Sequence, residues 1–358
     1  MSADTAGTSA FWTGRTVFLT GHTGFKGAWL TALLHRLGAK TTGYALAPLS
    51  PSLFQSARVG ELATSVIADI RDGARLAAEM QAAQPTIVFH FAAQALVGRA
   101  RIDPVETFES NVMGTAQLLE AVRRTLSVEA VVVITSDKVY DNAEWLWAYR
   151  ETDPLGGKEP YGASKAACEM VVQSWRHSYF SGPDRSVPVV TARAGNVIGG
   201  GDWAEDRLVP GAMRAFAAGE TLMLRNPTAV RPWQHVLEPL NGYLLLAEKL
   251  ASRTVPQDLA AFNFGPAAED ARPVAWVTDQ LAALWGDGAA WGQSPGVKPY
   301  EAHLLEVDSA RAQTTLGWTP KWRLDQGLKR TVDWYRAVKD GQDARDITLA
   351  QIEDHLNG

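Results

Sequence analysis

The chain has 358 residues and a formal net charge of −5, with acidic and basic residues interspersed. A chain of this length buries about three quarters of its unfolded surface, which suits one large domain or two modest ones. The charge pattern gives no basic field for nucleic acid or for an acidic membrane, and no apolar run approaches membrane-spanning length, so we expect neither as a partner.

The single cysteine and the first residues bear on the location of the protein. Cys168 cannot form an internal disulfide and is compatible with a reducing cytoplasm. Residues 1–10 are small and polar and lack the apolar core of a signal peptide. We therefore expect a cytoplasmic protein.

The first predicted unit is a strand, a glycine-rich turn and a helix. An apolar strand at 16–20 leads into a turn, and a helix follows from Ala28 to His35. The turn consists of Gly21, His22, Thr23, Gly24, Phe25, Lys26 and Gly27. Glycines allow close backbone approach and free amides at a helix start attract anions, so this turn is predicted to bind the phosphates of a dinucleotide. The spacing differs from Gly-x-Gly-x-x-Gly, and the flanking strand and helix support the interpretation.

The next two strands bear on the cofactor. A strand at 40–46 ends in small residues and not in the acid that grips an NAD ribose, so NADP stays open as an alternative to NAD. A strand at 65–68 delivers Asp69 and Ile70, and Asp69 is a candidate to accept the adenine amino group. An equally good interpretation is that Asp69 or Asp72 caps the following helix. A strand at 86–91 ends at Phe91 and is followed by Ala92 and Ala93. These two side chains are small enough for a flat cofactor to lie against the backbone.

The stretch from Val131 to Lys165 contains the chemistry. A buried strand at 131–134 stops at Thr135-Ser136-Asp137-Lys138, which places a hydroxyl, a carboxylate and an amine where ligands of parallel sheets bind. Tyr161 and Lys165 are four residues apart and share one face of the next helix. A phenol has a pKa of about 10, and a nearby ammonium favours the phenolate, so the pair can take a proton from a hydroxyl. Taken alone, the pair is also typical of an ordinary amphipathic helix.

The alternation of strands and helices predicts a Rossmann-like, doubly wound parallel sheet of the α/β class, with a smaller discontinuous α/β lobe for the substrate. Further strands are expected at 187–192 and 261–264, and helices at 104–124, from 211, and at 236–250, 274–285 and 324–338. The predicted domains are 11–195 plus 232–265 for the dinucleotide and 196–231 plus 266–345 for the substrate, with terminal segments 1–10 and 346–358.

These motifs resemble those of the extended short-chain dehydrogenase/reductases that modify nucleotide sugars, the NAD-dependent epimerase/dehydratase family. The likeness spans roughly residues 11–339, and its most specific stretches are 20–27, 135–138, 141–150, 193–203 and 231–236. Asp137-Lys138, where relatives acting on dTDP-glucose carry Asp-Glu, is similar to the 4,6-dehydratases of CDP-glucose. The resemblance implies bound NAD, CDP-glucose as substrate, a homodimer built on the helices near 104–124 and 161–180, and no metal.

The resemblance also implies a role for each catalytic candidate. Ser136 bonds the sugar O4, Tyr161 takes its proton, and Lys165 bonds the nicotinamide ribose while lowering the tyrosine pKa. Asp137 and Lys138 divide the acid and base roles in the loss of water, and we favour Lys138 as the base that removes the C5 proton. Asn111 joins the cofactor contacts. The implied substrate contacts are Gln94, Asn196, Arg207, Leu208, Arg231 as a pyrophosphate clamp, and Glu301.

Three functions compete at this stage. A 4-epimerase returns hydride to C4 and needs no elimination pair, so small neutral residues would be expected at 137 and 138. A dehydratase for a dTDP- or GDP-hexose is the closer rival. A non-catalytic dinucleotide sensor would have no need of Ser136, Tyr161 and Lys165 together.

Overall fold

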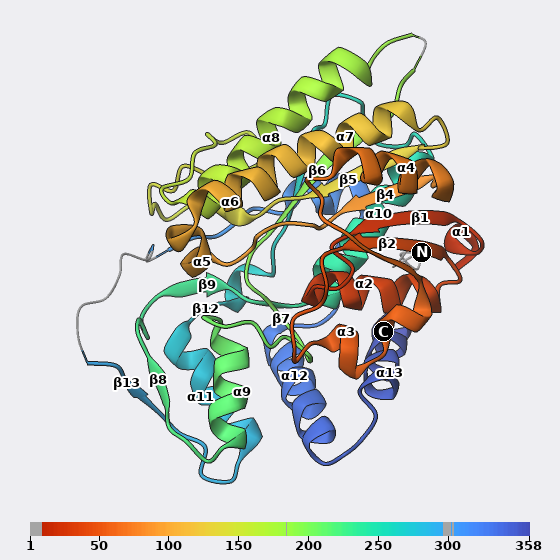
Figure 1. Ribbon diagram of the computed structural model, residues 1–358. Helices are drawn as coiled ribbons and strands as arrows, with labels where there is room; N and C mark the ends of the chain where they lie inside the picture. The colour runs from red at the N-terminus through yellow and green to blue at the C-terminus, as the bar shows by residue number, and fades with distance from the viewer. Residues whose placement is uncertain (1–8, 184, 296–301, 303) are drawn as a thin grey trace.

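The computed structural model of the protein describes residues 9–183, 185–295, 302 and 304–358 (Figure 1). At its centre lies a seven-stranded parallel sheet in the order β11-β6-β5-β4-β1-β2-β3. The strands are β1 (Thr16–Thr20), β2 (Lys40–Ala45), β3 (Thr64–Ile67), β4 (Ile87–His90), β5 (Ala130–Ile134), β6 (Val189–Ala194) and β11 (Ala261–Phe264). The predicted doubly wound α/β fold is confirmed.

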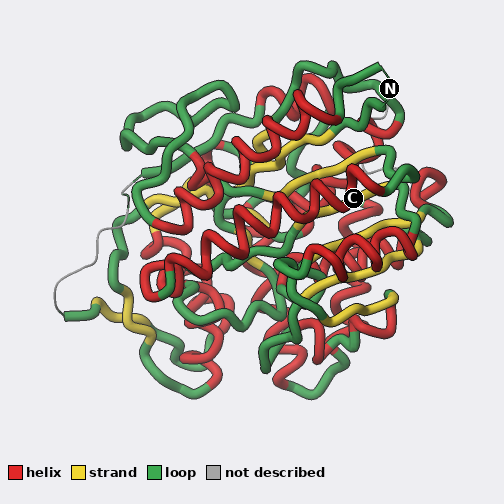
Figure 2. The backbone as a smooth tube through the Cα atoms, turned by 45° about the horizontal axis from the view of Figure 1, so that its top comes forward, coloured by secondary structure: helices red, strands yellow, loops and turns green. Residues whose placement is uncertain are grey.

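Helices cover both faces of the sheet, as Figure 2 shows. On one face α2 (Phe25–Arg36) and α10 (Leu237–Ala251) form a core with Val17 and Leu19 of β1. On the other, α4 (Gly73–Ala83), α7 (Gly114–Arg124) and α8 (Pro160–Tyr179) pack on Phe18 of the same strand. Successive side chains of a strand point to opposite faces, so a wholly apolar strand serves two cores at once.

The segment that precedes α7 is helical over most of its length. It comprises α5 (Val97–Ile102), α6 (Pro104–Phe108) and a π-helical turn (Glu109–Met113) that continues into α7. Asp103 caps α6 by accepting the amide of Glu106 at 3.0 Å, and Pro104 occupies the first helical position, which needs no amide donor. The helix predicted over 104–124 is therefore present, with a π-helical turn in its middle.

Short strand pairs and further helices lie beyond the carboxyl end of the sheet (Figure 1). The pairs are β7 (Val197–Ile198) with β10 (Gln234–His235), β8 (Leu222–Leu224) with β13 (Trp291–Gln293), and β9 (Val230–Pro232) with β12 (Ala271–Pro273). The remaining α-helices are α1 (Ser9–Trp12), α3 (Leu53–Ser56), α9 (Leu208–Ala217), α11 (Val274–Trp285), α12 (Leu324–Lys339) and α13 (Ala344–Asn357). Shorter turns are Val59–Leu62, Asp137–Val139, Ala268–Asp270 and Ala312–Leu316. Within the described ranges no helix is long and apolar enough to cross a membrane.

The sequence did not identify α13. Asp343 caps it by accepting the amides of Arg345 and Asp346, and Ile352 is completely buried. His355 near its end bonds the Glu238 carboxylate of α10 at 3.0 Å. The last residues are therefore packed against the main body of the protein.

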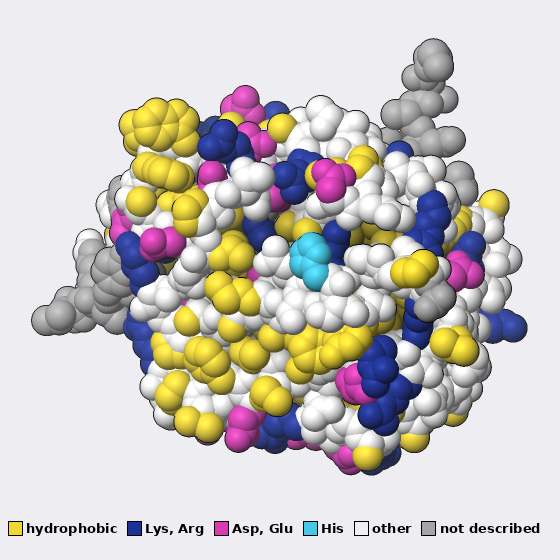
Figure 3. All heavy atoms as spheres, turned by 90° about the horizontal axis from the view of Figure 1, so that it is seen from above, with side chains coloured by type: hydrophobic (Ala, Val, Ile, Leu, Met, Phe, Trp, Pro, Cys, Tyr) yellow, Lys and Arg dark blue, Asp and Glu magenta, His cyan; other side chains and the backbone are white. Residues whose placement is uncertain are grey.

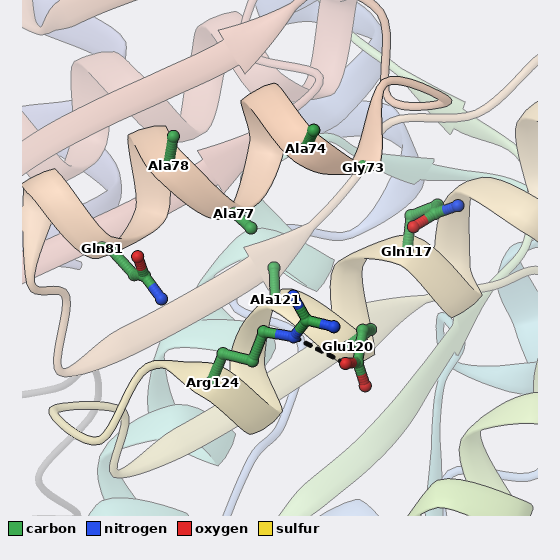
Figure 4. Close-up of a pocket in the computed structure, with 9 residues that line it drawn as sticks. All are labelled: Gly73, Ala74, Ala77, Ala78, Gln81, Gln117, Glu120, Ala121 and Arg124. Atoms are coloured by element: carbon green, nitrogen blue, oxygen red, sulfur yellow. Dashed lines mark hydrogen bonds and ion pairs between the residues drawn. The ribbon is translucent and has the colours of Figure 1, made fainter.

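A groove of about 480 Å³ lies between α4 and α7 on the outside of the helical layer (Figure 4). Its lining consists of Gly73, Ala74, Ala77, Ala78, Gln81, Gln117, Glu120, Ala121 and Arg124. None of the predicted site residues lines it, so the candidate chemistry lies elsewhere.

Candidate active site

The motifs singled out in the sequence follow the carboxyl ends of neighbouring strands. The sheet order reverses direction between β1 and β4, which is the switch point where parallel sheets bind ligands. The glycine turn follows β1, residues 91–94 follow β4, and residues 135–138 follow β5. Together with the segment after β6, four segments that are far apart in sequence therefore lie along the same edge of the sheet.

The glycine turn is built for close backbone approach. Gly21 has a φ of +79°, and a Cβ there would lie 2.7 Å from the Ala92 amide nitrogen, so the turns after β1 and β4 touch. A Cβ on Gly27 would lie 2.1 Å from the Gly21 carbonyl oxygen. Helix α2 starts at Phe25, earlier than predicted, which brings its first free amides beside the exposed Gly24. Free amides at an open glycine fit a dinucleotide pyrophosphate.

Two side chains of this turn bond within the protein. The His22 Nε2 lies 2.7 Å from the Ser65 hydroxyl. Burial lowers the pKa of His22 to about 4, and the Tyr44 backbone carbonyl acts in the opposite sense. The Thr23 hydroxyl donates to the Leu46 carbonyl at 2.9 Å. Both contacts tie the turn to the second and third strands of the sheet.

Lys26 stands out because a cation in the first turn of a helix is unfavourable unless an anion is nearby. Burial lowers its pKa to about 8, as do the charges of Arg207 and Lys165, whereas Asp137 acts in the opposite sense. Lys26 is therefore within electrostatic reach of Arg207, Lys165 and Asp137. This excess of cations suits a ligand that carries phosphates.

The predicted adenine contacts lie after β3. The Asp69 carboxylate pairs with Arg71 at 2.6 Å, and these hydrogen bonds hold the pKa of Asp69 below its usual value. Asp72, and not Asp69, caps α4, since its carboxylate accepts the Arg75 amide at 3.0 Å. Ile70 is buried in the core. Of the two capping alternatives, Asp72 is the one observed.

The turn after β4 is clamped to α8. The amides of Phe91 and Ala92 both donate to the Thr20 hydroxyl at 3.1 Å. The Asn111 side chain accepts the Gln94 amide at 2.8 Å and donates to the Gln94 carbonyl and to Ser164. The Gln94 side chain folds back onto Leu96 and Thr107. Ala93 is half-buried within the same clamp.

The five catalytic candidates come together at the end of β5 and the start of α8. Glu159 caps α8 by accepting the amides of Tyr161 and Gly162, each at 2.8 Å, which fixes Tyr161 in the first turn. Tyr161 and Lys165 are both buried, as their shared helix face predicted. Tyr161 is hydrogen-bonded to Ser136, and the Ser136 hydroxyl donates to Asp137 Oδ1 at 2.9 Å. Asp137 is only 4% exposed and Lys138 is half-buried, which is not the arrangement of a surface salt bridge.

The pKa values of Tyr161 and Lys165 are dominated by burial and not by attraction between the two side chains. Burial raises the pKa of Tyr161 to about 12, and the hydrogen bond to Ser136 and the charge of Arg207 oppose that rise. Burial lowers the pKa of Lys165, whose amine donates to the Ile134 carbonyl at 3.0 Å. The amine thus caps the last carbonyl of β5.

Most of the substrate candidates follow β6 along the chain, and Arg207 is within electrostatic reach of this cluster. Arg207 pairs with Asp202 at 2.8 Å and its charge reaches Tyr161 and Lys26. Leu208 begins α9, and Asn196 follows β6 at half-buried depth. Arg231, in β9, donates to the Val230 carbonyl at 2.8 Å. Glu301 lies outside the described residues.

A buried network behind the site was missed in the sequence analysis. Arg193 and Glu169 form two hydrogen bonds of 2.8 and 2.9 Å, and Glu169 also accepts the hydroxyls of Thr135 at 2.6 Å and Thr191 at 2.7 Å. Arg193 continues to the Tyr140 hydroxyl at 2.8 Å. The available signal was an arginine inside an otherwise apolar strand, because such a charge is buried only with a partner.

The family model of the NAD dependent epimerase/dehydratase family matches residues 17–265, and the chain belongs to that family. It is 46% identical over 351 residues to the CDP-glucose 4,6-dehydratase of Salmonella typhimurium, covering 97% of this chain and 98% of that protein. It is 27% identical over 295 residues to the dTDP-glucose 4,6-dehydratase of Xanthomonas campestris, covering 75% of this chain and 77% of that protein.

Solved structures share the fold. The UDP-glucose-4-epimerase of Stenotrophomonas maltophila, solved with bound NAD, has a TM-score of 0.79 at 23% identity, over 91% of this chain and 99% of that chain. The dTDP-glucose 4,6-dehydratase DesIV of Streptomyces venezuelae has a TM-score of 0.76 at 24% identity, over 91% and 98%. Epimerases and dehydratases thus share this architecture, and the residues of the site must separate the two activities.

Proposed function

We propose that the protein is a nucleotide-sugar 4,6-dehydratase that converts CDP-glucose to CDP-4-dehydro-6-deoxyglucose and water with bound NAD. The observation that carries the proposal is the buried acid and half-buried amine at Asp137 and Lys138, next to the hydrogen-bonded Ser136 and Tyr161. The near full-length likeness to a relative named for this reaction supports the same substrate.

The residues present fit NAD. The open glycine turn and the start of α2 offer amides for a pyrophosphate, with Lys26 beside them, and Phe91, Ala92 and Ala93 provide the surface for the nicotinamide end. Bound NAD supplies an acceptor that takes hydride from the sugar C4 and returns it to C6. Because β2 ends without an acidic residue, NADP remains the alternative cofactor.

The first half of the reaction needs a hydrogen bond and a base at the C4 hydroxyl. Ser136 bonds the sugar oxygen and Tyr161 takes its proton. Because burial raises the Tyr161 pKa to about 12, the cations near the site must bring it down. Arg207 already acts in that direction, and Lys165 is the family's candidate for the same task.

The second half is an elimination. The new C4 ketone acidifies the C5 proton, since its removal gives an enolate. We assign that proton to Lys138, and Asp137 protonates the departing C6 hydroxyl, so that water leaves. Groups of opposite charge can divide such roles when their surroundings shift them unequally.

The competing functions are less well supported. A 4-epimerase has no use for an acid and an amine at 137 and 138. A sensor of the cofactor alone has no use for the hydrogen-bonded Ser136 and Tyr161. A dehydratase for another nucleotide sugar would use the same catalytic set, so only an assay with several substrates separates it.

The test is incubation of the purified protein with NAD and, in parallel, CDP-, dTDP-, UDP- and GDP-hexoses. We expect the 4-keto product, which absorbs in alkali, from CDP-glucose first and fastest. No product from CDP-glucose would defeat the assignment, and faster turnover of another nucleotide would replace the substrate while keeping the reaction.

We also propose the division of labour between the two lobes. Residues 11–195 and 232–265 form the NAD-binding domain, and all seven strands of the large sheet fall within them. Residues 196–231 and 266–345 form the nucleotide-sugar-binding lobe, which contributes Asn196, Arg207, Leu208 and Arg231. Arg231 is assigned to the pyrophosphate because its fork of donors matches phosphate oxygens.

We further propose a homodimer formed through α6, α7 and α8. Figure 3 shows hydrophobic side chains gathered in a band on this face of the molecule. Val105 is 67% exposed, Met113 53% and Met170 60%. Val105 and Met113 also line an apolar hollow together with Pro104, Phe108, Glu109 and Val112. Contiguous apolar surface of this kind marks an interaction site.

Sedimentation velocity tests the dimer. We expect a mass near twice 38.8 kDa for the wild type and a monomer for the double variant Val105→Glu/Met113→Glu. Met223→Glu, an equally exposed methionine on β8, is the control and should stay dimeric. A monomeric wild type would refute the proposal.

A further inference from the structure

Tyr243 on α10 carries a hydroxyl that the roles assigned above leave unused. The side chain is completely buried, and its ring packs edge-on against Phe91 at 5.9 Å and Phe264 at 5.3 Å between centroids. Within the described residues the hydroxyl has no hydrogen-bond partner. Burying a hydroxyl without a partner is unfavourable, and such groups in native proteins call for an explanation.

The position of this hydroxyl suggests what its partner is. Phe264, which the Tyr243 ring contacts, is paired with Ala194 of β6, and a Cβ on the next residue, Gly195, would lie 3.0 Å from Asp137 Oδ2. The ring and the Asp137 carboxylate therefore border the same strand end. Burial raises the Tyr243 pKa above its ordinary value, and proximity to Tyr161 and Asp137 raises it further. Within the described residues, one ring nitrogen of His22 and one of His235 also lack a partner, but the pKa of neither histidine is influenced by Tyr161 or Asp137.

Asp137 loses a hydrogen bond when substrate binds in the proposed way. Its Oδ1 accepts the Ser136 hydroxyl at 2.9 Å, and that same hydroxyl is the one assigned to the sugar O4. A tyrosine hydroxyl both donates and accepts. It can therefore donate to one oxygen of Asp137 while the other oxygen carries the proton for the C6 oxygen, and it keeps that hydrogen bond to the carboxylate once the proton has gone.

We propose, on the basis of the proposed function, that Tyr243 is a positioning residue whose hydroxyl bonds Asp137 during the loss of water. The C5 proton passes to Lys138, the C6–O bond breaks, the Asp137 proton leaves with the oxygen as water, and a C5–C6 double bond forms. Tyr243 keeps its own proton throughout. Its contribution is to hold the acid at the C6 oxygen and to stabilise the carboxylate that remains.

Tyr243→Phe tests the inference because it removes only the hydroxyl and keeps the ring between Phe91 and Phe264. Since no partner is lost in the free protein, we expect its thermal midpoint to equal or exceed that of the wild type. We expect kcat with CDP-glucose to fall about tenfold to a hundredfold, the range for losing one hydrogen bond to a carboxylate. KM should change little. Absorbance of reduced cofactor at 340 nm should build up, because oxidation at C4 precedes the impaired step.

A double-mutant cycle with Asp137→Asn supplies the second readout. If Tyr243 acts through Asp137, the double variant Tyr243→Phe/Asp137→Asn should be no slower than Asp137→Asn alone. A wild-type kcat in Tyr243→Phe without build-up at 340 nm, or additive losses in the cycle, overturns the inference. A wild type that forms no 4-keto product removes the proposed function and this inference together, whereas an unchanged Tyr243→Phe beside an active wild type removes this inference alone.

Discussion

Glu169→Gln should destabilise the protein and slow catalysis, because it breaks the buried ion pair with Arg193 while keeping the size of the side chain. The side chains of Glu169 and Arg193 are only 6% and 3% exposed. Burial lowers the pKa of Arg193, but the hydrogen bonds and charge of Glu169 outweigh it and hold that pKa above its ordinary value. The variant leaves a buried guanidinium without its counter-charge.

The size of the effect follows from burial. Removing one partner of a buried pair costs about 3–5 kcal/mol, because the other charge stays in a low-dielectric interior. Unfolding entropy of about 2.1 cal/mol/K per residue amounts to roughly 0.75 kcal/mol/K for this chain, so the expected fall in Tm is about 4–7 °C. Thr135 loses its charged acceptor at the same time, and it directly precedes Ser136. We therefore expect kcat to fall as well.

Differential scanning calorimetry against a matched surface variant checks this reasoning. Arg15 and Glu129 form a pair of similar length, 2.9 Å, with side chains 29% and 46% exposed. An exposed pair contributes less than about 1 kcal/mol, so Glu129→Gln should move Tm by no more than about 1 °C. Replacing Glu169 and Arg193 together by apolar residues should recover part of the loss. A Glu169→Gln protein that melts with the Glu129→Gln control would refute the argument.

Three further outcomes are expected. Lys138→Ala should spare C4 oxidation but slow exchange at C5; solvent deuterium appearing at C5 at the wild-type rate, followed by NMR, would contradict the assignment. Burial, with the charge of Lys165 adding to it, lowers the pKa of His90 to about 3. Below pH 6.5 the unfolded chain protonates this histidine but the folded protein does not. The free energy of unfolding therefore falls with pH, by about 2 kcal/mol between pH 6.5 and 5. The Tm of His90→Gln should fall less steeply over that range, whereas the exposed His177→Gln should follow the wild type. Gly27→Ala should weaken NAD binding in calorimetric titration and lower Tm, because its Cβ would lie 2.1 Å from a carbonyl oxygen; Gly24→Ala, with 3.4 Å to the same oxygen, should keep its Tm.

The doubly wound parallel sheet was predictable because local signals agreed with one another. Each core strand is an apolar run that is followed by glycine, small or polar residues. This pattern is typical of parallel strands that are buried on both faces. The helix over 274–285 was predicted with its observed ends, and strand β6 begins two residues later than expected, at Val189. Helix α2 begins at Phe25 because the glycine turn is itself the start of the helix.

The missed features depend on contacts between distant residues. Glu169 lies within α8 and Arg193 within β6, and the sequence around either residue does not indicate its partner. Helix α13 has no strong apolar periodicity, and it is held by contacts such as His355 with Glu238 of α10. Tyr243 likewise reads as one more aromatic residue in an apolar helix. Its distinction, a buried hydroxyl that has no partner among the described residues, exists only in three dimensions.

Ser136 shows why substrate binding and acid placement are coupled in this site. Its hydroxyl accepts the Lys138 amide at 3.2 Å, which caps the short turn holding both elimination residues, and it donates to Asp137 at 2.9 Å. It is also the hydrogen-bond partner of Tyr161. A sugar hydroxyl that takes over the Ser136 proton leaves the cap intact, since the cap uses the oxygen lone pair, but it releases Asp137. The acid is thus freed for the C6 oxygen only when a sugar is in place, and a carboxyl released in a buried site needs another hydrogen bond, which Tyr243 is positioned to give.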